Sequence, residues 1–208
     1  MIPLLIEVHY LPCIEYFAYL YHTNSIYIEA QENYVKQSYR NRCRIKGANQ
    51  VDDLSVPTVN MHAKVLVRDV KIDYTRNWAN QHRRAIRSAY GNAPFYEYYA
   101  SYFDEVWERK HKFLFDLDMD MLEKCLQLTG ISKQIGLTER YEKEKETSLI
   151  DRRGKISPKF DSENYDKVAS AKYYQNFGST FEPNLSIVDL LFNEGKNTLE
   201  ILKLCKIV

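Results

Sequence analysis

A strongly basic segment near the start of the chain contains the residue types that bind phosphate groups. Residues 32–47, ENYVKQSYRNRCRIKG, carry five lysines and arginines against one acid, Glu32, although the 208-residue protein has a net charge of only +1. An arginine guanidinium group can hold a phosphate or carboxylate group through two parallel hydrogen bonds, and interleaved tyrosines can donate a hydroxyl group or stack on a base or sugar. The segment therefore predicts a site for a small anionic, phosphate-bearing ligand such as a nucleotide-sugar. Its expected binding residues are Asn33, Lys36, Arg40, Asn41 and Arg42.

The same segment also fits a solvated strand and turn whose cations pair with nearby acids. The acids available for such pairing are Glu29, Glu32, Asp52 and Asp53. We favour the ligand site because asparagines such as Asn33 seldom interrupt alternating cations without a role. Asn41 and Arg42 could each hold one ligand oxygen. Both the ligand site and the solvated strand and turn remain compatible with the sequence.

The turn after the first predicted strand is a second place where chemistry could occur. Residues 4–8 are an apolar run, Pro12 begins a helical pattern, and residues 25–29 form another strand, which together predict a βαβ unit with parallel strands. His9 and Tyr10 then lie at the carboxyl edge of the sheet, where ligands of open α/β sheets bind, beside a helix N-terminus that attracts anions. Tyr10 is a candidate substrate-binding residue, and His9 is either a general base or a structural histidine.

Trp78 and His82 share one face of a helix predicted to begin near residue 78. The ordinary explanation for His82 is a partly buried histidine held by one hydrogen bond. Alternatively, this face borders the site, so that Trp78 contacts the substrate and His82 exchanges protons, for which an unperturbed pKa of about 6.5 is suitable.

Two further polar residues lie four positions apart on a helix predicted to begin at Ser186. Asp189 and Asn193 share one face of this helix and either reach the substrate or serve capping and packing. The acidic residues Asp116, Asp118 and Asp120 lack the glycine and distal glutamate of a calcium loop. They are more simply the acidic start of a helix that Asp118 caps and Gly130 ends.

Composition excludes several functional classes. The 29 basic and 28 acidic residues are nearly balanced, which argues against a protein that coats nucleic acid. The four cysteines and five histidines are scattered, so we expect free thiols and no metal site, and the lack of a Gly-rich phosphate loop predicts no nucleotide cofactor of that kind. No stretch approaches the roughly 20 apolar residues of a membrane span, and the N-terminus lacks the features of a signal peptide, which predicts a cytoplasmic protein.

The length of 208 residues predicts one domain of the α/β class. We expect a Rossmann-like sheet with the parallel N-terminal βαβ unit, packed by a predominantly helical C-terminal half. Further strands are predicted at residues 54–57, 66–72 and 135–138. The strand at 135–138 is predicted to be the last one in the chain. Residues 140–170 are polar and charged and predict an arm or lid.

Several separated blocks of this sequence resemble the WbqC-like family. They are the stretches EVHYLPCIEYFAYL, IYIEAQENYVKQSYRNRCRIKGANQ, NWANQHRRAIRSAYGNAPFYEYY and FEPNLSIVDLLFNEG, which contain Tyr10-Leu11-Pro12, Asn41-Arg42, Trp78 with His82, Ala93-Pro94-Phe95 and the final Leu185 to Asn193. The family takes its name from surface-polysaccharide (O-antigen) gene clusters. The resemblance therefore implies a cytoplasmic role near glycan or glycolipid assembly.

Two functions of different classes are compatible with these residues. The first is a group-transferring enzyme in which Lys36, Arg40 and Arg42 neutralise a phosphorylated or nucleotide-activated substrate and His82 or His9 acts as acid or base. The second is a non-catalytic binding or scaffolding protein that holds a glycan precursor or an acidic partner in the same basic groove. The residue types alone do not separate the two.

Overall fold

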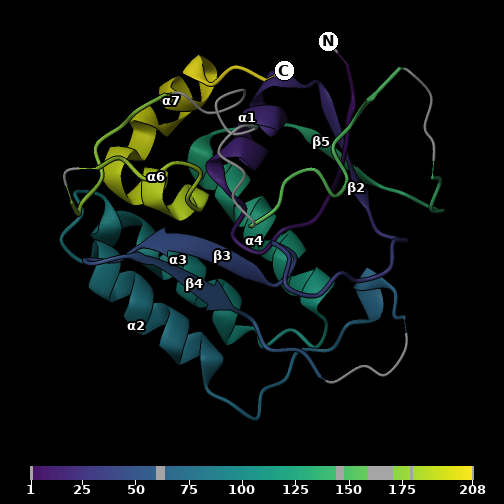
Figure 1. Ribbon diagram of the computed structural model, residues 1–208, viewed down its shortest axis with the longest axis horizontal. Coiled ribbons are helices and arrows are strands. Elements are labelled where there is room, and N and C mark those ends of the chain that lie inside the picture. Colours follow the sequence, from purple (N-terminus) through teal and green to yellow (C-terminus); the bar gives the residue numbers. More distant parts are fainter. Residues whose placement is uncertain (1, 60–63, 144–147, 159–170, 179, 208) are drawn as a thin grey trace.

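The protein has a mixed α/β fold built on a parallel sheet of four strands (Figure 1). The computed structural model describes residues 2–59, 64–143, 148–158, 171–178 and 180–207. The strands are β1 (Leu4–Glu7), β2 (Ser25–Glu29), β5 (Gln134–Leu137) and β6 (Ile150–Asp151), in the order β5-β2-β1-β6. All three neighbouring pairs are parallel. The predicted α/β class is confirmed, whereas the Rossmann-like arrangement stays a prediction.

The predicted βαβ unit is confirmed. Helix α1 (Ile14–His22) joins β1 to β2, and the two strands pair in register from Leu4 opposite Ile26 to Glu7 opposite Glu29. All four residues of β1 are buried, as expected for a strand of a parallel sheet covered on both faces, whereas β2 exposes Tyr27. The turn between β1 and α1 thus lies at the carboxyl edge of the sheet.

The basic segment ends in an antiparallel hairpin of β3 (Arg42–Lys46) and β4 (Val51–Ser55). Cys43 and Ile45 are buried while Arg42 and Arg44 are half-buried, the period-two pattern of a strand with one face on the core. The hairpin packs against α2 (Trp78–Tyr90) and α6 (Ile187–Glu194) (Figure 1).

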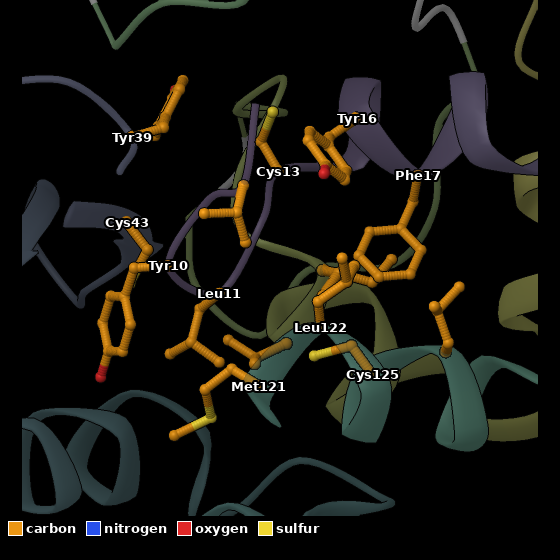
Figure 2. Packing of buried hydrophobic residues seen from close by; sticks show 14 of the residues in the cluster. Tyr10, Leu11, Cys13, Tyr16, Phe17, Tyr39, Cys43, Met121, Leu122 and Cys125 are labelled. Atoms are coloured by element: carbon orange, nitrogen blue, oxygen red, sulfur yellow. The ribbon is translucent and has the colours of Figure 1, made fainter. Parts of the chain in front are cut away.

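The remaining helices pack around these two sheets. They are α3 (Tyr96–Glu108), α4 (Leu114–Thr129) and α7 (Thr198–Leu204), with short 3₁₀ turns η1 (Val67–Asp69) and η2 (Gly195–Asn197). Figure 2 shows Leu11 of the turn after β1 close to Met121 of α4, and Phe17 of α1 close to Leu122 of α4. All four cysteines are buried and free, as predicted.

Two predicted strands differ from the structure. Residues 66–72 contain η1 and take part only in isolated bridges, because buried Val67 and Val70 are three apart and suit a helical turn. β5 is not the last strand, since β6 follows it and pairs with β1. β6 comes from the segment predicted as an arm. Of that segment, residues 144–147 and 159–170 lie outside the described residues.

The start of α4 also differs from the prediction. The helix begins at Leu114, so Asp118 lies within its second turn and is fully buried instead of capping it. Leu114 and Phe115 are themselves buried, and burying them extends the helix toward the N-terminus. The predicted end is confirmed, because Gly130 follows the helix with φ +74°, a left-handed conformation that suits glycine.

Candidate acid–base site at the carboxyl edge of the sheet

A group of buried charged side chains lies where β1 and β2 end. Glu7 and Glu29 are the last residues of the two strands, stand opposite each other in the parallel register, and are both fully buried. Two carboxylates buried side by side are unfavourable unless cations neutralise them. The residues that meet this requirement form what we call the carboxyl-edge cluster: Glu7, His9, Glu29, Glu32, Arg40 and Arg153.

Each strand-end carboxylate has its own arginine. The Arg40 guanidinium group binds Glu32 through two hydrogen bonds, from Nε to Oε1 at 2.6 Å and from Nη2 to Oε2 at 2.8 Å, and its Nη2 atom lies 3.4 Å from Oε1 of Glu7. The Nη1 atom of Arg153 donates to Oε2 of Glu29 at 2.7 Å, and its Nη2 atom donates to Asp151 at 2.6 Å. The two arginines therefore offset part of the negative charge of the three carboxylates, Glu7, Glu29 and Glu32.

The segment after β6 contributes a backbone donor to Glu7. The N–H group of Gly154 points at both carboxylate oxygens of Glu7, at 3.1 and 3.0 Å. Gly154 adopts φ +67°, a conformation that favours glycine. On the other strand, the hydroxyl group of Thr138 donates to Glu29. Burial by itself would raise the pKa of Glu7, but His9 and Arg40 beside it hold that pKa at about 2.

His9 is the member of this cluster best suited to proton transfer. Its ring lies between the rings of Tyr16 and Tyr39, with centroid distances of 4.8 and 5.4 Å, and its Nε2 atom is 3.4 Å from Oε1 of Glu7. Neither ring nitrogen has a hydrogen-bond partner among the described residues. Full burial lowers the pKa of His9, although Glu7 opposes that shift. His9 is therefore a neutral imidazole at pH 7 that can accept a proton beside a carboxylate.

Asp118 of α4 is a second buried group without partners. It is fully buried, and neither carboxyl oxygen has a hydrogen-bond partner within the described parts of the chain. Burial raises the pKa of Asp118 well above its ordinary value, with only partial opposition from Arg40. Burial therefore favours the protonated form of Asp118. Buried, unpaired ionisable groups of this kind are candidates for functional residues.

A second group of ring side chains lies at α2. It consists of Trp78 and His82 of that helix and Tyr10 of the turn after β1. The hydroxyl group of Tyr10 is 2.9 Å from Nδ1 of His82, and the rings of Trp78 and His82 meet edge to face at 5.2 Å. Burial lowers the pKa of His82 to about 4, so its imidazole is neutral near pH 7. The hydrogen bonds of His82 with Tyr10 and with the Ser55 backbone, together with the lowered pKa, favour the structural interpretation of His82.

The residues predicted from the basic segment occupy different environments. Asn33 and Lys36 are exposed, and the side-chain amide of Asn41 donates to the Val56 carbonyl oxygen at 3.0 Å. Arg42 is half-buried, and its Nε atom has no hydrogen-bond partner among the residues described. Arg40 is buried in its ion pair with Glu32, which is the pairing that the alternative interpretation expected. A ligand phosphate would have to compete with that carboxylate.

Asp189 and Asn193 lie in a separate polar group on α6. Asp189 accepts a hydrogen bond from the hydroxyl group of Tyr173, and burial raises its pKa to about 6. The amide of Asn193 donates to the Asp189 carbonyl oxygen at 2.8 Å, within the same helix. Nearby, Nζ of Lys46 donates to the Thr180 carbonyl oxygen at 2.6 Å. These bonds fit the capping and packing interpretation of the two residues.

Sequence reasoning missed Glu7, Glu29, Asp118, Arg153 and Gly154 as parts of a site. A usable signal was present: Glu7 and Glu29 are charged residues at the ends of two apolar strands, and Asp151-Arg152-Arg153-Gly154 combines two cations with a glycine. In the described part of the chain, no group of three or more His, Cys, Asp or Glu residues is arranged to hold a metal ion. No helix within the described ranges is long and apolar enough to cross a bilayer.

Comparisons with known proteins place the chain in a family. The model of the WbqC-like protein family matches residues 8–174 and 162–201. The chain is also similar to the uncharacterized protein Rv1507c of Mycobacterium tuberculosis, with 26% identity over 231 residues and coverage of 97% of each chain. No solved structure matches it. With its family model covering most of the length, the chain belongs to the WbqC-like protein family.

Proposed function

We propose that this protein is a cytoplasmic enzyme that transfers a group from a phosphorylated or nucleotide-activated intermediate of surface-polysaccharide or glycolipid biosynthesis. The reaction takes place at the carboxyl edge of the sheet, with His9 as general base. The observation that supports this function best is the state of His9: a fully buried imidazole, 3.4 Å from the Glu7 carboxylate, with no hydrogen bond to either nitrogen among the described residues. Family membership supports the association with glycan assembly.

In this proposal Glu7 and His9 act as a proton-accepting pair. His9 removes the proton from an acceptor hydroxyl group, and the acceptor oxygen forms a bond to the transferred group. The bond from that group to the phosphate oxygen breaks, and the leaving phosphate keeps the electron pair. The ionised Glu7 carboxylate stabilises the imidazolium ion that His9 becomes. Asp118, which is unpaired among the described residues and whose pKa is raised by burial, is the candidate proton donor to the leaving phosphate.

The test is a search for turnover. The protein is incubated with nucleoside-diphosphate sugars, sugar phosphates and a mixture of monosaccharide acceptors, and ³¹P NMR detects the released phosphate species. His9→Gln should lower the rate by roughly a hundredfold or more, the contribution of a general base. The matched control is His22→Gln, because His22 bonds the Cys205 carbonyl oxygen and lies outside the cluster. It should turn over at the wild-type rate.

Two results would refute this function. One is turnover that survives in a folded His9→Gln protein. The other is an absence of turnover of every donor by the wild-type protein. If His9→Gln does not fold, the pH profile of the wild-type rate takes its place. Because burial lowers the pKa of His9, the rate should stay constant as pH falls through 6.5 and decline only at lower pH.

The second candidate function is a non-catalytic binding protein. The observation in its favour is that Arg40 is held by Glu32 and Glu7, so that this cation is already paired within the chain. In a binding protein this ion network serves to join the strand ends. Binding of a sugar phosphate without any release of phosphate in the same ³¹P experiment supports this candidate.

A further inference from the structure

A basic groove lies between α2 and α3, and none of the residues of the carboxyl-edge cluster lines it. The cavity has a volume of about 370 Å³ and is open to solvent. This volume falls in the range of roughly 300–1,000 Å³ that is usual for sites of small molecules. We call it the α2–α3 groove.

Three arginines of α2 line the groove. Arg87 follows Arg84 by three positions and Arg83 by four, so it lies on the same side of the helix as each of them. The guanidinium group of Arg83 is fixed in place, because its Nε atom donates to Asp104 at 2.8 Å and it lies 5.8 Å from the ring centre of Trp107. Asp104 is the one acidic residue among those lining the groove.

Arg84 and Arg87 differ from Arg83 in having no acidic partner among the described residues. Both side chains are exposed, and their guanidinium groups make no hydrogen bond or ion pair with any described residue. Two guanidinium groups from residues three positions apart on α2, both lining the cavity, match the charge of one phosphate group. Each can bind phosphate oxygens through two parallel hydrogen bonds.

The floor of the groove is apolar and rigid. Ile86, Phe103, Trp107 and Phe192 line it, and each is at most 4% exposed. Close-packed side chains of this kind hold their positions when a ligand binds, so little ordering opposes binding. The half-buried ring of Tyr96 adds a polar hydroxyl group and an aromatic edge to one wall.

We propose that the α2–α3 groove is a binding site for a small phosphate-bearing molecule, whose phosphate group is held by Arg84 and Arg87 and whose organic part lies on the apolar floor. A polynucleotide is a poorer match, since the protein carries a net charge of only +1 and the free cations of the groove are confined to one turn of helix. The site stands apart from the proposed function, because no residue of the groove takes part in the proton transfer assigned to His9.

One hydrogen bond makes the groove observable by NMR. Trp107 lines the groove, and its Nε1–H group donates to the hydroxyl group of Tyr10. The protein has two tryptophans, so the ¹⁵N-labelled protein shows two indole signals that Trp107→Phe and Trp78→Phe assign. A ligand in the groove should move the Trp107 signal in a saturable way.

The experiment titrates inorganic phosphate, uridine diphosphate and glucose 1-phosphate into the labelled protein, with succinate as a carboxylate probe. Uridine diphosphate or glucose 1-phosphate should bind more tightly than inorganic phosphate, because only they can contact the floor. The double variant Arg84→Ala/Arg87→Ala should weaken their binding by about tenfold or more. Arg68→Ala/Arg76→Ala removes the same charge from exposed arginines outside the groove and should change it less than about twofold.

Each contrary outcome is decisive. Equal weakening by both double variants means that binding follows net charge, and the site does not exist. The same holds if none of the three phosphate probes moves the Trp107 signal. Succinate binding as tight as phosphate binding makes it a carboxylate site and overturns the phosphate assignment. His9→Gln should leave these affinities unchanged, so that failure of the groove and failure of the proposed enzyme are seen separately.

Discussion

The indole Nε1–H group of Trp107 donates a 2.9 Å hydrogen bond to the hydroxyl oxygen of Tyr10, and so joins α3 to the turn that follows β1. The same hydroxyl group is 2.9 Å from Nδ1 of His82 on α2. All three side chains are buried. One tyrosine hydroxyl group therefore connects two helices to the turn that carries His9 at the carboxyl edge of the sheet.

This connection predicts an energetic coupling between Tyr10 and Trp107. Tyr10→Phe and Trp107→Phe should each destabilise the protein, because each leaves a buried polar group without its partner. In a double-mutant cycle measured by urea unfolding, the double variant should lose about 1 kcal/mol less stability than the sum of the two single variants' losses. Effects that add to within about 0.3 kcal/mol would show that the bond contributes nothing to stability.

The buried ion pairs of the carboxyl-edge cluster should matter far more than exposed ones. Glu7→Gln leaves the buried Arg40 cation with one carboxylate fewer and should destabilise the protein by roughly 3 kcal/mol or more. Asp104→Asn is the contrasting control, because the Arg83–Asp104 pair is 28% and 44% exposed and its loss should reduce stability by less than about 1 kcal/mol. Urea unfolding at pH 7 measures both. Equal losses would contradict the structural role assigned to the cluster.

Gly154 should be sensitive to substitution although there is room for a side chain. An added Cβ atom meets nothing within 4 Å at Gly154 or at Gly130, and both residues have positive φ. Alanine at either position should therefore destabilise the protein by about 1 kcal/mol through backbone conformation alone.

Gly154→Ala should have a second effect that Gly130→Ala lacks. The Gly154 N–H group helps to keep Glu7 ionised, and the pKa of Glu7 is lowered to about 2 in the folded protein. The stability that Glu7 contributes is thus present above pH 4.5 and lost as pH falls toward 2. In an acid titration followed by circular dichroism, Gly154→Ala should unfold at a higher pH than Gly130→Ala. Coincident transitions would argue against the bond to Glu7.

Asp189 should reduce stability at neutral pH. Its pKa rises from 3.8 to about 6 on folding, so the folded state favours the protonated form. The contribution of the protonated Asp189 carboxyl group to the free energy of unfolding is complete below pH 3.8. It is lost as pH rises through 6, which lowers the free energy of unfolding by about 3 kcal/mol at 1.36 kcal/mol per pKa unit. The unfolding free energy of wild type minus that of Asp189→Asn should therefore fall between pH 4 and pH 7.5. A pH-independent difference would exclude the raised pKa.

Local patterns in the sequence were sufficient for many of the elements. The apolar run of residues 4–8, the helical start at Pro12 and the strand at 25–29 predicted the parallel βαβ unit, because each depends on neighbours within a few residues. Gly130 correctly ended its helix for the same reason. Asp118 was misplaced as a cap because its burial depends on packing of α4 against the rest of the core.

The site was predicted less completely than the fold. His9 and Tyr10 were assigned to the carboxyl edge of the sheet from the βαβ pattern, and they follow β1 directly in the structure. The basic character of Arg40 suggested a ligand, whereas its partner is Glu32, eight residues earlier in the chain. Residue type showed that a charge was present but did not show which opposite charge would neutralise it.

The sequence by itself determined the strand–helix–strand order of the first 30 residues and the parallel pairing of the first two strands, since side-chain periodicity and turn residues act over short distances along the chain. Only the tertiary structure decided that Arg153 pairs with Glu29 and that Gly154 binds Glu7, contacts that span 124 and 147 residues. The physical reason is that a buried carboxylate needs a cation or an N–H donor from whichever segment packs against it. That segment is chosen by the packing of β6 on β1, for which the local pattern of residues 140–170 contains no signal.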